Sequence, residues 1–165
     1  MDEQQRKAAL KETFDTVSGG YDGVALRFFS QSAQSMVSLL DLRGDEHALD
    51  VACGTGHASL AVARMLPNGR VTGVDFSAGM LDQARSKAAL RGIGNIEFLE
   101  RDMTALGFPA ESFDVALCAF GIFFVDDMAE RNARHEVGED LIHFVIVAVR
   151  SGIQCATTDN LIWRS

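Results

Sequence analysis

The chain has 165 residues, of which 47% are hydrophobic and 23% charged, with only two prolines. These values suit a single folded domain and exclude a disordered or collagen-like chain. The formal net charge is −8 and the Lys and Arg residues are scattered, so the surface repels phosphates and we expect no nucleic-acid partner. We interpret the denser basic groups, at Arg6 and Lys7 and from Arg85 through Lys87 to Arg91, as solvated helix faces.

The cysteines Cys53, Cys118 and Cys155 lack the spacing of metal ligands, and an odd number does not form a disulfide framework. We therefore predict no metal site and a reducing, cytoplasmic location. The N-terminus carries mixed charge where a secretory signal has an apolar core. The longest apolar run, residues 141–149, contains His143 and is too short to span a bilayer, so we expect no membrane span.

Residues 1–45 are predicted to form an N-terminal helical arm. A helix is expected over 3–14, a Ser-Gly-Gly break follows it, and a second helix is expected over 24–40. The apolar residues of the arm fall at helical spacing, which predicts packing on the core. Phe14 and Tyr21 are also candidates for a lid, because they flank the Ser-Gly-Gly segment.

Apolar strands alternate with helical segments over residues 46–128, the predicted cofactor-binding core. We expect strands at 48–52, 70–75, 96–100 and 113–119, a helix at 56–66, and a second helix capped by Ser77 that ends at Arg91 and Gly92. This alternation predicts an α/β fold: a Rossmann-like, doubly wound, mostly parallel sheet with helices on both faces, in three α/β/α layers. Ligands bind such sheets at the carboxyl ends of the strands, where the strand order reverses.

Two glycines, Gly54 and Gly56, separate the first strand from the first helix in the segment LDVACGTGHASLAVA. Glycine lets a ligand approach main-chain N–H groups, and the start of a helix favours a carboxylate or phosphate. Asp75 ends the next strand, where a carboxylate can accept hydrogen bonds from both hydroxyls of a ribose. These signals fit a dinucleotide as well as other adenosyl cofactors.

Two residues distinguish these ligands. A dinucleotide turn prefers Gly or Ala at the position of Ser59, and Asp50, just before the glycines, would repel a pyrophosphate but attract an ammonium group. The predicted ligand is therefore a zwitterion that carries adenosine. An NAD-dependent oxidoreductase remains a less favoured alternative.

Four segments, in this order, resemble the motifs of the class I S-adenosylmethionine-dependent methyltransferases. DVACGTG at 50–56 resembles the first motif, and GVDFS at 73–77, followed by Met80, resembles the second. RDM at 101–103 is similar to the turn after the third strand, and FDVALC at 113–118 is similar to the fourth-strand motif. Together the four are far more specific than any one of them.

The resemblance implies S-adenosyl-L-methionine as the cofactor. In the family the first motif wraps the methionine part of the cofactor, and the acid of the second accepts hydrogen bonds from the ribose hydroxyls. The third motif reads the adenine edge, and the end of the fourth lies beside the methyl group. The implied cofactor-binding residues are Asp50, Ala52, Cys53, Gly54, Gly56, Asp75, Phe76, Met80, Asp102, Met103 and Cys118.

Within the family, residues 14–21 and 49–124 are similar to the ubiquinone and menaquinone biosynthesis C-methyltransferases. After about residue 128 the sequence departs, and we regard 129–165 as an atypical, truncated or altered C-terminal segment in which 141–149 substitutes for a fifth strand. We therefore expect incomplete C-terminal strands and an exposed sheet edge, which a homo-oligomer could cover.

The resemblance implies methyl transfer to a small-molecule acceptor, a reaction that requires no invariant catalytic residue. The catalytic residues are therefore left unassigned, and none of the four histidines is given the role of a general base. His57 is expected on an exposed first turn of a helix, and Phe120, Phe123 and Phe124 could form an aromatic wall for the acceptor. The alternative is a non-catalytic module that binds S-adenosylmethionine or a partner.

Overall fold

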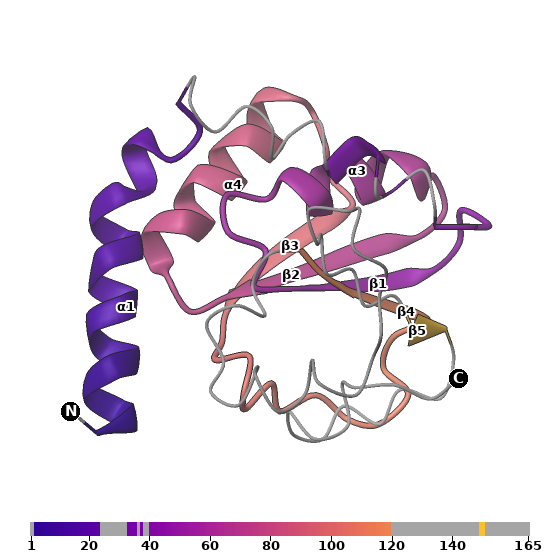
Figure 1. Ribbon diagram of the computed structural model, residues 1–165. Helices are drawn as coiled ribbons and strands as arrows, with labels where there is room; N and C mark the ends of the chain where they lie inside the picture. Colours follow the sequence, from indigo (N-terminus) through magenta and orange to yellow (C-terminus); the bar gives the residue numbers. More distant parts are fainter. Residues whose placement is uncertain (1, 24–32, 36, 38–39, 120–148, 151–165) are drawn as a thin grey trace, which may run out of the picture.

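The computed structural model describes residues 2–23, 33–35, 37, 40–119 and 149–150 (Figure 1). Its elements in chain order are α1 (Glu3–Val17), the 3₁₀ turn η1 (Ser18–Gly20), β1 (His47–Val51), α3 (His57–Met65), β2 (Arg70–Asp75), α4 (Ala78–Leu90), β3 (Ile96–Glu100), β4 (Val115–Cys118) and β5 (Val149–Arg150). Residues 33–35 and 37 are helical as well, and the rest of the helix predicted over 24–40 lies outside the described residues.

The sheet has the strand order β3-β2-β1-β4-β5, and the first four strands are parallel. β5 pairs antiparallel with β4 over two residues. The strands β2 and β3 are added on one side of β1, and β4 is added on its other side. This reversal of the strand order at β1 creates a crevice at the carboxyl ends of the strands. The predicted mostly parallel sheet and α/β fold are confirmed.

The strands bury both faces of the sheet, as their apolar residues require. Ala48 contributes to a cluster with α3 residues such as Val62, and Leu49 on the opposite face packs with Leu106 and Phe113 from the 101–114 connection. Figure 1 shows α3 and α4 on one side of the sheet and that connection on the other. Within the described residues no helix covers this second face.

The helix α4 follows its sequence pattern closely. The Ser77 hydroxyl accepts a hydrogen bond from the Met80 main-chain N–H at 3.1 Å, as the predicted N-cap requires. Four residues on one face are buried: Met80, Leu81, Ala84 and Ala88. The predicted cap and buried face are both confirmed.

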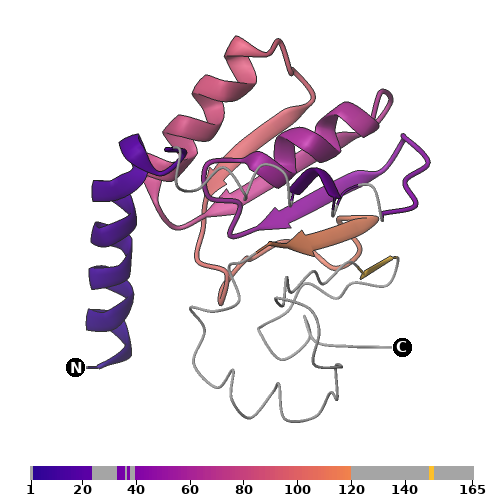
Figure 2. The same cartoon turned by 45° about the horizontal axis from the view of Figure 1, so that its top comes forward.

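The packing that we expected of the arm is seen in part: Ala33 and Val37 are buried in the core, whereas the helix α1 has no buried residue. Polar contacts from one side of α1 hold it, together with the ring of Phe14. Lys7 pairs with Asp102 at 3.1 Å, and Asp15 accepts a 2.5 Å hydrogen bond from the Ser77 hydroxyl. Lys11, between them, donates to the main-chain oxygen of Phe76. α1 therefore lies beyond the carboxyl ends of the strands, on the side to which the β1 and β4 arrowheads point in Figure 2.

Most residues of the C-terminal predictions lie outside the described residues. Of the strand predicted over 141–149, Val149 alone is described, and it begins β5. Phe120, Phe123 and Phe124 lie outside the described residues. No helix in the described part is long and apolar enough to cross a bilayer.

Candidate functional site

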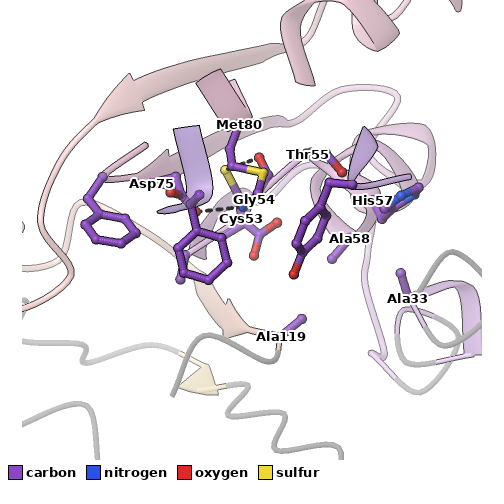
Figure 3. A pocket seen from close by; sticks show the side chains of 14 residues that line it. Ala33, Cys53, Gly54, Thr55, His57, Ala58, Asp75, Met80 and Ala119 are labelled. Atoms are coloured by element: carbon purple, nitrogen blue, oxygen red, sulfur yellow. Dashed lines mark hydrogen bonds between the residues drawn. The ribbon is translucent and has the colours of Figure 1, made fainter. Parts of the chain in front are cut away.

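A cleft of about 100 Å³ lies at the carboxyl ends of β1 and β2 (Figure 3). Its lining includes predicted cofactor-binding residues: Asp50, Ala52, Cys53, Gly54, Asp75, Phe76 and Met80. The two lid candidates, Phe14 and Tyr21, line it too. Residues that the sequence reasoning did not assign complete the lining: Ala33, Thr55, His57, Ala58 and Ala119. The structure thus places most of the first two motifs around one cavity.

The loop after β1 has an unusual backbone. Ala52 and Gly54 have positive φ angles of 54° and 53°, a left-handed region that a residue with a side chain rarely adopts. A Cβ built on Gly54 would meet no atom of the described residues within 4 Å, so this position opens onto the cleft. By contrast, a Cβ on Gly56 would lie 2.9 Å from the Cβ of Ala84. Gly56 therefore serves helix packing, and because it is not among the residues that line the cleft, its role in cofactor binding stays a prediction.

Asp75 ties this loop to the start of α4. Its Oδ2 accepts a 2.8 Å hydrogen bond from the Gly54 N–H (Figure 3). Its Oδ1 accepts a 2.9 Å bond from the Ser77 N–H. The side chain is buried, and burial raises the pKa of Asp75 even though these main-chain bonds act in the opposite direction. The carboxylate that was predicted to bind a ribose therefore also holds the glycine loop in place.

Asp50 is fully buried beside the cleft. Its Oδ2 accepts a hydrogen bond from the Ser59 hydroxyl, whereas Oδ1 has no partner among the described residues. Burial raises the pKa of Asp50 from 3.8 to about 7, with a contribution from the charge of Asp75, although the Ser59 bonds lower it. A buried oxygen without a donor is costly, so a ligand that brings a cation or a donor to this point would be stabilised.

The thiol of Cys53 lies in the same cleft but has no anionic character. Burial raises the pKa of Cys53 well above its ordinary value of 9.0, and the neighbouring charges of Asp50 and Asp75 add to the effect. Because the thiolate is the reactive form of cysteine, this side chain acts as a small apolar wall.

Besides Gly56, three predicted residues do not line the cleft. Asp102 accepts hydrogen bonds from the Thr104 N–H and hydroxyl and pairs with Lys7. Met103 and Cys118 pack in the cluster on the second face of the sheet. Their assignment to the adenine edge and the methyl group stays a prediction without support from the shape of the cleft.

The exposed first turn expected for His57 is not found, because its side chain is only 20% exposed and contacts Asp22 of the arm. On the basic face predicted from Arg85 to Arg91, Arg85 is 47% exposed, but Lys87 contacts Asp22 too and is only 15% exposed. The arm also supplies aromatic cover: the Phe14 ring meets the Phe76 ring edge to face with 5.9 Å between centroids. Burial raises the pKa of Tyr21, which is the next ring along the arm.

A metal site is not indicated by the described residues, where no three His, Cys, Asp or Glu side chains are grouped suitably.

Residues 48–139 match the methyltransferase domain family. The chain belongs to this family. The match starts at β1 and includes every strand and loop that forms the cleft, so the resemblance inferred from the motifs is confirmed.

Among curated relatives of this methyltransferase domain, the aklanonic acid methyltransferase of Streptomyces sp. (strain C5) is 31% identical over 136 residues, which are 82% of this chain and 62% of that protein. The demethylmenaquinone methyltransferase of Geobacillus kaustophilus (strain HTA426) is 30% identical, over 75% of this chain and 55% of its own length. The nocamycin O-methyltransferase of Saccharothrix syringae is 33% identical, over 74% of this chain and 44% of its own length. The chain thus spans only part of the length of these relatives.

Solved structures support the fold. The phosphoethanolamine N-methyltransferase 1 of Haemonchus contortus aligns with a TM-score of 0.65 and 19% identity over 77% of this chain and 28% of that chain. An S-adenosylmethionine-dependent methyltransferase of Aquifex aeolicus aligns with a TM-score of 0.52 and 21% identity, over 61% of this chain and 53% of that chain. At these identities the likeness concerns the arrangement of strands and helices alone.

Proposed function

We propose that this domain binds S-adenosyl-L-methionine in the cleft and transfers its methyl group to a small-molecule acceptor. The observation that carries the proposal is the pair of buried carboxylates, Asp50 and Asp75, which line the cleft together with the bare Gly54. Family membership supports methyl transfer over the NAD-dependent alternative.

The charge of the cleft favours this cofactor. Its described lining contains two aspartates but no Lys or Arg. A pyrophosphate would meet the field of both carboxylates, whereas an ammonium and a sulfonium would be attracted by it. The unpartnered Oδ1 of Asp50 fits the ammonium group, directly or through a water.

The other parts of the cofactor also find suitable partners. Asp75 is an acceptor for ribose hydroxyls, and the ring of Phe76 with Met80 suits the adenine. The start of α3 favours the carboxylate of the amino acid, because main-chain N–H groups point outward from a helix N-terminus.

When bound, S-adenosylmethionine supplies a methyl group on a sulfonium that is already a good leaving group. The residues of this chain are left with alignment and the exclusion of water, which Phe14, Tyr21 and Phe76 provide at the mouth of the cleft. Cys53 and Tyr21 keep their protons, because burial raises both pKa values. We assign no general base.

The acceptor is proposed to be a small molecule. The relatives named for aklanonic acid, demethylmenaquinone and nocamycin support this class. The net charge of −8 disfavours a nucleic acid. A cytoplasmic location and a homo-oligomer that covers the sheet edge are further proposals, made on sequence grounds.

Isothermal titration with S-adenosylmethionine and with S-adenosylhomocysteine tests the binding. We expect heat from both, and none from NADH under the same conditions. No heat from either adenosyl compound, or protection from thermal unfolding by NADH alone, would overturn the proposal.

Transfer of a tritiated methyl group to a panel of small acidic, phenolic and quinol acceptors tests the reaction. Turnover of any acceptor supports the enzyme. Tight binding of the cofactor without turnover across the panel would instead favour the non-catalytic module.

A further inference from the structure

One carboxylate of the arm joins three parts of the fold. Oδ1 of Asp22 accepts hydrogen bonds from the Thr55 hydroxyl at 2.7 Å and from His57 Nε2 at 2.8 Å. Oδ2 accepts a hydrogen bond from the Lys87 ammonium. Thr55 and His57 flank the glycine at the start of α3, and Lys87 belongs to α4. Asp22 therefore fastens the arm to the glycine loop after β1 and to the helix α4.

The charges of this cluster are partly shielded from water. Asp22 is 35% exposed and its partners less. Burial raises the pKa of Asp22, but the hydrogen bonds from Lys87, Thr55 and His57 outweigh it and leave the pKa below its ordinary value. Among the described residues, Arg91 is a further charge near the cluster, and its repulsion adds to the burial that lowers the pKa values of His57 and Lys87. Asp22 is thus the anion that holds these groups together. Charge-assisted hydrogen bonds of this kind stabilise a contact more strongly than an exposed ion pair does.

The closed arm leaves little room. Small-molecule sites usually enclose roughly 300 to 1,000 Å³. The cleft beneath Phe14 and Tyr21 encloses about 100 Å³. Phe14 and Tyr21 therefore limit the room that a nucleoside-sized ligand finds in the cleft. Tyr21 stands immediately before Asp22, so the contacts of Asp22 help to fix the position of this ring, which lines the cleft.

The structure also indicates where the arm would move. α1 is fixed by its own contacts, among them the bond from the Ser77 hydroxyl to Asp15. The 3₁₀ turn η1 lies between this fixed helix and Asp22. Breaking the Asp22 contacts would leave α1 attached and would leave Tyr21 held from the side of α1 only, where its ring meets that of Phe14 with 6.2 Å between centroids.

We propose that Asp22 is a positioning residue that latches the N-terminal arm over the cleft, so that the cofactor enters and leaves only when its bonds to Thr55, His57 and Lys87 break. The identity of the ligand rests on the proposed function, whereas the closure of the arm does not.

The sequence offers a direct probe of the latch, because Tyr21 is the only tyrosine. Protein labelled with 3-fluorotyrosine gives a single ¹⁹F resonance that reports on this ring. In the ligand-free chain we expect Asp22→Asn and Lys87→Met to move the resonance toward its position in urea-unfolded protein. Asp82→Asn, which breaks an exposed ion pair with Arg85 on the same helix α4, should leave it unchanged. A wild-type resonance in Asp22→Asn protein would overturn the latch.

Cofactor exchange provides the second measurement. Stopped-flow mixing with S-adenosylhomocysteine should show both association and dissociation faster in Asp22→Asn and Lys87→Met, by about 3- to 30-fold. The double variant should be no faster than the singles, since both remove the same latch, and Asp22→Glu should restore slow exchange. Loss of thermal stability with unchanged exchange rates would show a merely structural role and overturn the proposal.

Failure of the two proposals can be told apart. If wild-type protein binds no S-adenosylhomocysteine, the proposed function fails, and the ¹⁹F spectra of the ligand-free variants still decide whether Asp22 holds the arm closed. If binding occurs but the Tyr21 resonance and the exchange rates do not respond to Asp22→Asn, only the latch fails.

Discussion

Replacing Asp50 with Asn should remove a pH dependence from the stability of the ligand-free chain. The pKa of Asp50 is about 7 in the folded protein and 3.8 in its ordinary state. Between these values the folded state keeps a proton that the unfolded state has lost, so the free energy of unfolding falls as the pH rises. Above about pH 7 both states are ionised and the penalty stays constant.

The size of the effect follows from the two pKa values. The difference between the two pKa values corresponds to a total change of about 4 kcal/mol in the free energy of unfolding. Of this change, about 2 to 3 kcal/mol develops between pH 5 and pH 8. Asn cannot ionise, so the variant lacks this part of the pH dependence. We expect wild-type protein to lose about 2 to 3 kcal/mol relative to Asp50→Asn over this interval.

Urea unfolding at pH 5, 6, 7 and 8, followed by circular dichroism, measures the difference between the two proteins at each pH. Other titrating groups are common to both proteins and cancel. Asp45→Asn, at a carboxylate that is 65% exposed, is the matched control and should run parallel to wild type. Parallel curves for Asp50→Asn would refute the claim that burial raises the pKa of Asp50.

Three further predictions concern the cofactor loop and its partners. Asp75→Ala should weaken binding of S-adenosylhomocysteine by about 1 to 3 kcal/mol in calorimetry, because ribose hydroxyls and the glycine loop lose an acceptor; unchanged affinity would contradict the ribose assignment. Gly54→Val should abolish that binding, since its side chain fills the open space, and binding at wild-type affinity would show that the ligand lies elsewhere. Gly56→Ala should lower the melting temperature, because its Cβ would stand 2.9 Å from that of Ala84, and an unchanged melting temperature would contradict the packing role.

The sequence predicted the parts of the fold that local patterns encode. Ser77 followed by apolar residues at helical spacing identified α4 and its cap, and the glycines between an apolar run and a helical run located the cofactor loop. Asp75 was found for the same reason, since it ends a buried strand. Each of these signals depends on neighbours within one element or one turn.

The latch could not be predicted in this way. Asp22 contacts Thr55, His57 and Lys87, which lie 33, 35 and 65 residues away in the chain. Polar contacts across such distances leave no periodicity, so His57 and Lys87 looked like exposed residues. The docking of α1 was missed for a similar reason, because polar side chains hold it together with the ring of Phe14, and the helix has no buried apolar stripe.

Asp102 illustrates a different limit. The resemblance of its motif predicted a contact with adenine, but in this structure its carboxylate is engaged by Thr104 and Lys7. A motif locates a residue near a site, whereas the partners of the side chain depend on which other element packs there. Here α1 brings Lys7 to the end of β3.

The central claim is that the cleft between Asp50 and Asp75 holds S-adenosylmethionine. Titration of ¹⁵N-labelled chain with S-adenosylhomocysteine, followed by ¹H–¹⁵N correlation spectra, tests it most directly. We predict that the largest shifts occur at the main-chain amides of Gly54, Thr55, Phe76 and Ser77. A spectrum that does not change, or whose shifts lie away from the carboxyl ends of β1 and β2, would contradict the claim.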